Sequence, residues 1–292
     1  MTLSHVHLQG HVGVGSSSGT FRNITIALPD DPQDDSPAIT VGSYTPGDGG
    51  PPSLRLYDST VTSNGDAIRG GGVVVEGSTL AARLPTAVGL RIGYGGGGRL
   101  TNSTVEEIAN RGSVTLINST ITTRSPDRLA YDAHCEAALT STNSILDGSC
   151  VVSPPNCSAG FEGTSESGGG NVEVGGATCG FVDETDQSNV TPEEIALGPL
   201  ADNGGPTLTR ALGADSVAVD AAVLDACPPT DQRGAPRPEP GGVGCDSGAF
   251  ELPEPTASVL GAVALGLLAA LRRPRRRLPG RARGLADANP HD

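Results

Sequence analysis

Short alternations of apolar and polar residues recur through the first 125 residues, and each is followed closely by a second apolar stretch. The recurring unit has six residues: an apolar residue, a variable one, a corner of Asn, Asp or Gly type, two residues that are usually Ser and Thr, and a closing apolar residue. Alternation predicts a strand with one buried face. The unit occurs at 21–26, 56–61, 75–80, 100–105 and 116–121, with a weaker sixth copy from Thr140 to Ile145.

The two apolar positions of each unit are five residues apart, an odd step that breaks the alternation of a single strand. The break falls on residue types that tolerate a left-handed backbone. A strand, a one-residue corner and a second strand form the bend of a parallel β-helix, in which equivalent residues of successive coils align in ladders. The predicted ladder of corner residues is Asn23, Asp58, Gly77, Asn102 and Asn118.

The spacing of the units supports stacked coils with loops of unequal length. The first apolar positions lie at 21, 56, 75, 100, 116 and 140, so successive copies are 35, 19, 25, 16 and 24 residues apart. A helical repeat protein keeps a more constant period. A β-sandwich of short strands is the alternative, but the repeats lack the tight hairpin dipeptides between them that such a fold uses.

The asparagines of the units also match N-glycosylation acceptor triplets. Because Asp58 and Gly77 occupy the same point of the repeat, the structural interpretation is favoured over glycosylation. The triplets begin at Asn23, Asn102, Asn118, Asn156 and Asn189.

Composition agrees with a narrow all-β core. The 292 residues include 42 Gly, 23 Pro and no Trp, aromatic residues make up 3%, and all 19 basic residues are Arg. A net charge of −14 argues against nucleic acid as a partner, because neutralising phosphates requires a basic face.

Six cysteines appear, all of them after residue 126, without a CxxC pair. An even number in this pattern predicts disulfides and an oxidising compartment, with buried free thiols as the alternative. Six cysteines allow fifteen connectivities, and sequential pairing is one of them. It would join Cys135 to Cys150, Cys157 to Cys179, and Cys227 to Cys245.

Four phrases in the second half of the chain occur in a distinctive order: 197–209 (LGPLADNGGPTLT), 215–221 (DSVAVDA), 227–238 (CPPTDQRGAPRP) and 245–251 (CDSGAFE). They resemble the closing region of bacterial choice-of-anchor Q proteins. The resemblance implies a secreted, surface-held protein with right-handed parallel β-helix repeats before this region. We expect Asp231–Gly234 and the Cys227/Cys245 pair to cap the last coil, with charged residues there serving as hydrogen-bonded structural groups.

The C-terminal tail combines a short motif, an apolar segment and a basic cluster. Residues 256–271 are uncharged, which is short of the ~20 residues of a spanning helix. The tail resembles the PEP-CTERM sorting signal of Gram-negative bacteria, which implies export, an anchor in the membrane through this segment, and processing by an exosortase-like enzyme. The signal consists of Pro253, Glu254, Pro255, Arg272, Arg273, Arg275, Arg276 and Arg277.

The expected organisation has four parts. Residues 1–125 form β-helix repeats, 126–252 form Cys-containing terminal coils and a loop-rich cap, 253–277 form the sorting segment with a short hydrophobic helix, and 278–292 form a disordered tail. The first residues lack the pattern of a signal peptide. We therefore expect the chain to begin inside a longer open reading frame.

Candidate chemistry in the sequence is sparse. Glycoside hydrolysis needs two carboxylates, and the pairs Asp30/Asp31 and Asp34/Asp35 are available, but their Pro-bounded loop favours a solvated acidic turn. Imidazoles that would suit a metal, without an evident carboxylate partner, are His5, His7 and His11. Rings available for stacking on sugars are Tyr44, Tyr57, Tyr94 and Tyr131.

The sequence therefore predicts a non-enzymatic surface or matrix protein, without a cofactor, that adheres to or packs within an extracellular polymer, either a polysaccharide or another surface polymer. The alternative is a carbohydrate-active enzyme of the same fold, either a polysaccharide lyase or a glycoside hydrolase. Three or more Asp, Glu or Arg side chains that converge on adjacent coils would favour the enzyme.

Overall fold

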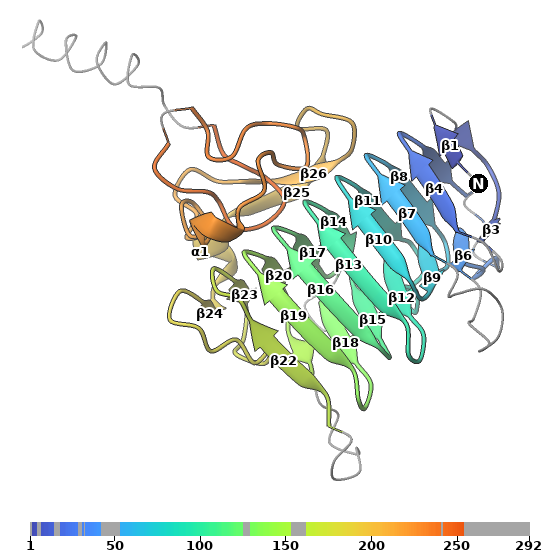
Figure 1. The fold of residues 1–292 in the computed structure, drawn as a ribbon, viewed down its shortest axis with the longest axis horizontal. Coiled ribbons are helices and arrows are strands. Elements are labelled where there is room, and N and C mark those ends of the chain that lie inside the picture. Colours follow the sequence, from blue (N-terminus) through green and yellow to red (C-terminus); the bar gives the residue numbers. More distant parts are fainter. Residues whose placement is uncertain are drawn as a thin grey trace, which may run out of the picture. The chain divides into compact units, whose positions relative to one another are not determined.

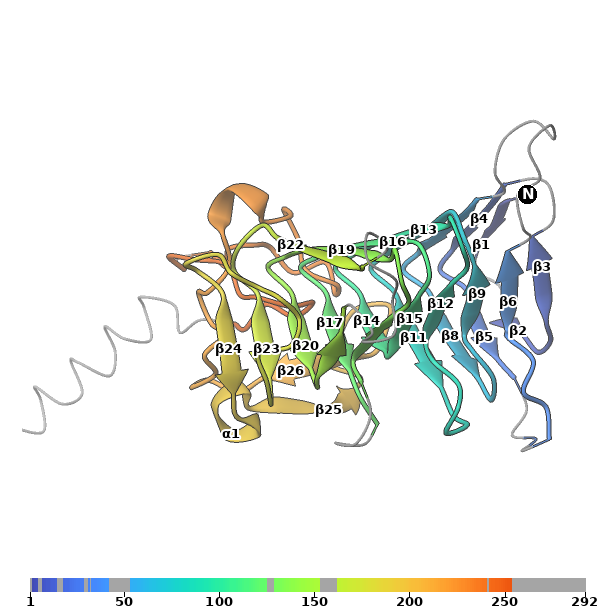
Figure 2. The same ribbon diagram turned by 90° about the horizontal axis from the view of Figure 1, so that it is seen from below.

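The computed structural model describes residues 2–4, 7–14, 18–28, 31, 33–41, 53–124, 129–152, 162–240 and 242–253. Contacts place residues 1–254 in one compact unit. Within the described residues, three parallel sheets run along a stack of coils, and each of the first seven coils contributes one strand to each sheet (Figures 1 and 2). The fold is an all-β parallel β-helix, as predicted. The short hydrophobic helix expected near the C-terminus lies outside the described residues.

The first sheet, sheet A, contains β1 (Thr2–Ser4), β4 (Gly19–Arg22), β7 (Leu54–Tyr57), β10 (Val73–Glu76), β13 (Gly97–Thr101), β16 (Ser113–Ile117), β19 (Ala138–Thr142) and β22 (Thr164–Ser167). Sheet B contains β2 (His7–Leu8), β5 (Thr25–Ala27), β8 (Thr60–Ser63), β11 (Thr79–Ala82), β14 (Thr104–Glu106), β17 (Thr120–Thr122), β20 (Ile145–Asp147), β23 (Val172–Val174) and β24 (Gln187–Val190). Sheet C contains β3 (Val12–Val14), β6 (Ile39–Val41), β9 (Ile68–Gly70), β12 (Leu90–Ile92), β15 (Ile108–Asn110), β18 (Tyr131–Ala133) and β21 (Cys150–Val151).

We number the coils from the N-terminal end of the stack. Coil 4 is β10, β11 and β12; coil 5 is β13, β14 and β15; coil 6 is β16, β17 and β18; and coil 7 is β19, β20 and β21. The first apolar residue of each repeated unit pairs in register with the next, so Leu56 pairs with Val75, Val75 with Leu100 and Leu100 with Leu116. The irregular spacing in sequence is absorbed entirely by loops.

The corner between sheets A and B consists of single left-handed residues. The φ angles are 48° at Asn23, 47° at Asp58, 60° at Gly77, 46° at Asn102 and 43° at Asn118. Asn and Asp adopt this conformation at a smaller energetic cost than other residues with a Cβ. Gly has no Cβ and adopts it without a steric cost. The chain can therefore turn sharply at every coil while the next strand keeps its hydrophobic face inward.

The sixth copy of the unit begins one residue later than the predicted Thr140. Leu116 pairs with Ser141, and the left-handed corner is Asn143, with φ of 52°. The prediction of its start was wrong because the position that is apolar elsewhere is Ser141 here. Its hydroxyl donates to Asn171 Oδ1 inside the coil at 2.8 Å. Because this inward position is polar, the pattern of apolar residues does not show where the sixth unit starts.

A ladder of buried serines follows the corner residues. The backbone N–H at this position donates to the serine Oγ of the next coil, as from Ser59 to Ser78 at 3.1 Å and from Ser103 to Ser119 at 3.4 Å. Each hydroxyl also donates to a carbonyl two residues earlier, at 2.9 Å from Ser103 to Thr101. The sharp corner leaves these N–H groups pointing along the stack, and the serine supplies a buried acceptor that an apolar residue would lack. The ladder consists of Ser59, Ser78, Ser103, Ser119 and Ser144.

At the C-terminal end of the stack, β24 pairs in parallel with β23. A short helix, α1 (Pro192–Ile195), follows and is capped by Thr191 and Glu194. The chain continues into the antiparallel strands β25 (Leu197–Ala201) and β26 (Thr209–Leu212), and into a 3₁₀ turn, η1 (Leu224–Ala226). No helix among the described residues has the length and apolar character needed to span a membrane.

Residues 197–253, which we call the closing region, run back along the outside of the stack. Thr207 Oγ1 donates to the carbonyl of Gly77 at 3.0 Å, and Asn102 Nδ2 donates to the carbonyl of Thr230 at 2.6 Å. Figure 1 shows the closing region in yellow-orange to orange alongside the sheet A–sheet B corner. The prediction that Asp231–Gly234 caps the last coil is therefore wrong. The corner asparagines of coils 5–7 and the outward threonines of coils 4–6 form two rows of hydrogen-bonding groups, and the closing region pairs with both rows.

Candidate functional site

The corner asparagines hold the closing region in place. The Nδ2 of Asn118 donates to the Asp246 carbonyl at 3.3 Å, and the Nδ2 of Asn143 donates to the Val223 carbonyl at 3.0 Å. Asn102 is 6% exposed and Asn118 is fully buried. Their amides are thus inside the folded protein, which removes these two positions from the glycosylation alternative.

The outward threonines form a second row of contacts to the closing region. Thr104 Oγ1 donates to Gln232 Oε1 at 2.7 Å, and Gln232 Nε2 donates to Thr79 Oγ1 at 3.0 Å. The N–H of Ala249 donates to Thr120 Oγ1 at 2.9 Å. The Asn-Ser-Thr phrase of the repeat therefore has three roles: the asparagine turns the chain and binds the closing region, the serine stabilises the interior, and the threonine binds the closing region again.

Charged residues of the closing region bond to one another and to backbone groups. The guanidinium of Arg237 has no exposed surface and donates to the carbonyls of Asp246 and Gly248, at 2.7 Å each. Asp231 Oδ2 accepts from Arg233 Nε at 2.8 Å and from the Glu251 N–H at 3.0 Å. These contacts favour the structural role that was expected for the charged residues of this region.

Burial dominates the pKa of the Glu251 carboxyl. It raises the pKa to about 7, although two backbone hydrogen bonds and the Arg237 guanidinium at 3.4 Å oppose this effect. Burial likewise raises the pKa of Asp246. The network therefore holds carboxyl groups that bind protons more tightly in the folded chain than in the unfolded chain.

Two disulfides are described, Cys227–Cys245 and Cys150–Cys179. Sequential pairing is right for the first and wrong for the second. Cys150 lies at the end of sheet C, and both it and Cys179 are buried in the main hydrophobic core of the stack, so folding brings together cysteines that are 29 residues apart. Cys135 is also disulfide-bonded. Cys157 lies outside the described residues.

The described residues of the acidic loop, 31 and 33–37, form a solvated turn. Asp31 Oδ1 accepts the N–H of Gln33 at 3.0 Å, and Asp34 Oδ1 accepts the N–H of Ser36 at 3.1 Å. The exposed ring of His11 lies 3.1 Å from the second oxygen of Asp34, so a carboxylate does accompany this imidazole, contrary to expectation. In the described part of the chain, no three His, Cys, Asp or Glu residues are placed to bind a metal.

Several sequence candidates lie outside the described residues. They are Asp30, the side chains of His5 and His7, Tyr44, Asn156, and the sorting-signal residues Glu254, Pro255, Arg272, Arg273, Arg275, Arg276 and Arg277. Pro253 is the last described residue.

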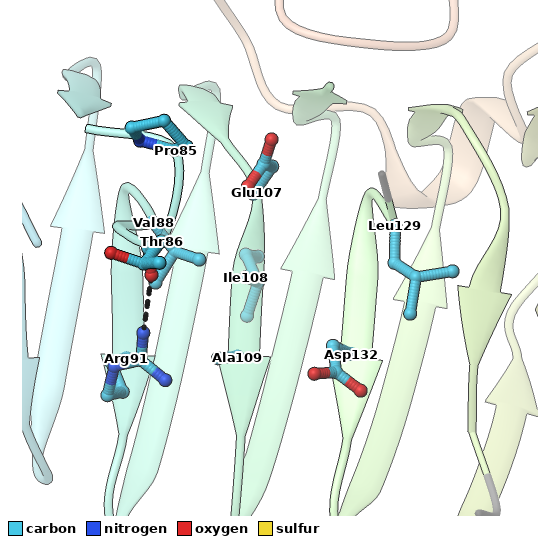
Figure 3. Close-up of a pocket in the computed structure, with 9 residues that line it drawn as sticks. All are labelled: Pro85, Thr86, Val88, Arg91, Glu107, Ile108, Ala109, Leu129 and Asp132. Carbon is cyan, nitrogen blue, oxygen red and sulfur yellow. Dashed lines mark hydrogen bonds between the residues drawn. The ribbon is translucent and has the colours of Figure 1, made fainter. Parts of the chain in front are cut away.

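A concave surface lies on the outer face of sheet C, over coil 5. Ala109 on β15 pairs with Arg91 on β12 and with Asp132 on β18, so a methyl group lies between two long polar side chains (Figure 3). The resulting cavity has a volume of about 390 Å³. A second hollow, which reaches Arg111 and His134, adjoins this cavity, and we call the two together the trough. The other residues that line the first cavity are Pro85, Thr86, Val88, Glu107, Ile108 and Leu129.

Loop lengths explain why the trough lies at coil 5. A single residue, Glu107, joins β14 to β15, whereas residues 83–89 make the equivalent connection in coil 4 and residues 123–130 in coil 6. The connection in coil 5 is therefore the shortest of the three. Glu107 has a φ of 61°, which permits this one-residue connection.

Arg91 is held firmly at the side of the trough. Its Nε donates to Asp66 Oδ2 at 2.6 Å, its Nη2 donates to Asp66 Oδ1 at 3.2 Å, and the same Nη2 lies 3.4 Å from the Thr86 carbonyl. Arg69 Nε also donates to Asp66, at 2.9 Å. Burial alone would raise the pKa of Asp66, but hydrogen bonds from Arg91 and the Val88 N–H outweigh it and lower the pKa. Three charged groups thus converge on adjacent coils, with the carboxylate ionised and occupied by the two arginines.

An aromatic cluster adjoins the far end of the trough. A hollow of about 240 Å³ shares Arg91, Ala109 and Asp132 with the first cavity and extends to Arg111 and His134. The ring of Tyr94 meets that of His134 edge-on at 5.6 Å, and the guanidinium of Arg111 lies 5.2 Å from the centre of the Tyr94 ring.

Tyr94 lies in the turn that follows coil 4, and His134 lies in the turn that follows coil 6, so their contact bridges the short turn that follows coil 5. Tyr94 is 68% exposed, the largest exposed aromatic surface among the described residues.

The sequence contains one signal for this surface, which lies in the spacing of the repeats and not in a motif. The spacing of 16 residues between Leu100 and Leu116 is the shortest in the series and lies between spacings of 25 and 24. A short coil between two longer ones predicts a hollow between loops. Comparison of the chain with family models, with curated proteins and with solved structures found no match, so the resemblance to choice-of-anchor Q proteins and to PEP-CTERM signals remains a prediction.

Proposed function

We propose that this chain is a non-enzymatic, exported protein of the bacterial surface or matrix that binds an extracellular polysaccharide in the trough of sheet C. The observation that carries the proposal is the trough itself. It consists of two adjoining open cavities lined by an ordered guanidinium and a carboxylate, and the exposed ring of Tyr94 lies beside its end, against Arg111 and His134. Sugar chains offer hydroxyl groups for such polar contacts and apolar ring faces for aromatic contacts.

Export is part of the same proposal. Disulfides persist in oxidising compartments and are rare in the cytosol, and two of them are described here. The C-terminal motif at 253–277 would then direct the chain to an exosortase-like enzyme after transient membrane anchoring. Intact mass of the protein from surface and cytoplasmic fractions tests this part, and a C-terminus near 253–256 in the surface fraction is expected. A full-length cytoplasmic chain would contradict it.

Affinity electrophoresis tests polysaccharide binding directly. The purified full chain, with its disulfides formed, is run through native gels that contain one soluble bacterial or plant polysaccharide each. Ala109→Arg fills the trough and should abolish any retardation. Thr115→Arg is the matched control, because Thr115 faces outward from sheet A on the neighbouring coil. Retardation that survives Ala109→Arg, or no retardation by any polymer, would contradict the proposal.

A carbohydrate-active enzyme is the second candidate, favoured by the convergence of Asp66, Arg69 and Arg91 on adjacent coils. The two arginines occupy the Asp66 carboxylate, which leaves Asp132 as the exposed carboxylate beside Ala109. Incubation of each retarding polymer with the protein, followed by analysis of chain length and reducing ends, separates the candidates. Cleavage that is lost in Asp132→Asn would replace the binding proposal with the enzymatic one.

A further inference from the structure

We infer that the trough selects an acidic saccharide, a sugar chain that carries uronate carboxylates, and that Arg91 is the group that pairs with a carboxylate. This inference rests on the proposed function and names its ligand class. Three observations support it: the fixed orientation of Arg91, the second cation along the trough, and the contrast between the trough and the rest of the molecule.

The fixed orientation comes from Asp66, whose side chain is 1% exposed. It binds the Nε and Nη2 edge of Arg91, so the guanidinium plane is set before any ligand arrives. The Nη1 group makes no hydrogen bond within the described part of the chain, and the Arg91 side chain is 32% exposed. An ordered guanidinium that presents free N–H groups to a cavity is well suited to a carboxylate. Because little side-chain entropy remains to be lost, binding is stronger than to a mobile surface arginine.

Arg111 supplies the second cation. Arg91 pairs with Ala109 on the neighbouring strand, and Arg111 comes two residues after Ala109 in the chain. At about 3.3 Å per residue along a strand and about 4.8 Å between strands, the two backbone positions are roughly 8 Å apart. Two cations along one trough suit a ligand whose carboxylates repeat, rather than a single small anion.

The other groups of the trough favour a sugar over an inorganic anion. The exposed Asp132 carboxylate repels an anion beside it but accepts hydrogen bonds from hydroxyl groups. The exposed face of Tyr94 suits a sugar ring. The ligand therefore has both carboxylate and hydroxyl groups.

The protein as a whole carries a net charge of −14, so an acidic polymer is repelled over most of the surface. Repulsion at long range and attraction at the trough would confine binding to one place. Salt screens both effects. We therefore expect binding to the trough to weaken with added salt, because the closest contacts are between guanidinium and carboxylate groups.

Calorimetry with two matched probes tests the inference. The first probe is a trimer of galacturonic acid, and the second is the same trimer with its carboxyl groups methyl-esterified. We expect the acidic trimer to bind more tightly by at least about tenfold, since a hydrogen bond between a guanidinium and a carboxylate is stronger than one to a neutral ester. Arg91→Gln should reduce affinity for the acidic trimer by at least about tenfold and leave the ester almost unaffected.

Arg69→Gln is the control for Arg91→Gln, because Arg69 also bonds to Asp66 but does not line the trough. It should leave the affinity for the acidic trimer unchanged. Arg111→Gln tests the second cation from an exposed turn, and it covers the case in which Arg91→Gln fails to fold. Weaker binding of the acidic trimer in Arg111→Gln is expected.

The outcomes separate this inference from the proposed function. Equal binding of the two trimers, both lost in Ala109→Arg, would overturn the acidic specificity and keep the saccharide site. Tight binding of the acidic trimer that Ala109→Arg does not affect would overturn both. Binding of neither trimer overturns the inference, and the proposed function then depends on the polysaccharide gels alone.

Discussion

Replacing Gln232 by Ala should release the closing region from the β-helix. Gln232 is 2% exposed. Its Nε2 lies within hydrogen-bond distance of Thr79 Oγ1, Thr207 Oγ1 and the Leu208 carbonyl, at 3.0, 2.9 and 3.0 Å, and its Oε1 accepts from Thr104 at 2.7 Å. The two N–H groups share three acceptors, so about three independent hydrogen bonds are lost. At a net value of about 1 kcal/mol each, the expected loss is about 3 kcal/mol.

Hydrogen exchange measured by mass spectrometry is the assay, because it reports the closing region and the coils separately. In Gln232→Ala, peptides from the closing region should exchange on the order of 100-fold faster, the change that about 3 kcal/mol corresponds to. Peptides from coils 2 and 3 should be unchanged. The matched control is Gln187→Ala, because the amide of Gln187 makes one hydrogen bond, to the Val217 carbonyl at 2.9 Å. If the two variants exchange equally, the contacts of Gln232 do not hold the closing region and the reasoning is refuted.

Three further perturbations test the interior and the network. Ser103→Ala leaves the buried N–H of Ser78 without its acceptor, and chemical unfolding should show a loss of about 1–3 kcal/mol. Replacing Cys227 and Cys245 together by Ser removes a cross-link across 18 residues and should lower the stability of the closing region by about 3 kcal/mol, which exchange rates would report. The free energy of unfolding should fall between pH 5 and pH 8, because folding raises the pKa of Glu251 from 4.5 to about 7 and deprotonation then favours the unfolded chain. Glu251→Gln should reduce this dependence of the unfolding free energy on pH.

The corner of the coil was predictable from sequence because its cause is local. A one-residue turn needs a left-handed backbone, which only a few residue types adopt at low cost. Those types therefore stand out wherever the alternation of apolar residues breaks. Five such positions were enough to predict the fold. The start of the repeated unit was predicted wrongly only in the sixth copy, where Ser141 replaces the usual apolar residue.

The path of the closing region could not be predicted, because its partners are distant in sequence. Gln232 bonds to Thr79 across 153 residues and to Thr104 across 128. Nothing local distinguishes a threonine that will be covered from one that faces solvent, such as Thr25 in the same row. The trough was also missed, since it arises from loop lengths in three successive coils rather than from a motif.

These findings assign different faces of one coil to different tasks. In coil 5, Asn102 and Thr104 bind the closing region, and Ala109 on the sheet C strand forms the floor of the trough. All the described residues that line the trough come from positions 85–135, and none comes from the closing region. Variants of the closing region should therefore change stability without changing saccharide affinity at a temperature where the protein stays folded, and Ala109→Arg should do the reverse. If Gln232→Ala altered both equally in folded protein, the two faces would be coupled through the coil, and the trough would have to be described as a property of the whole stack.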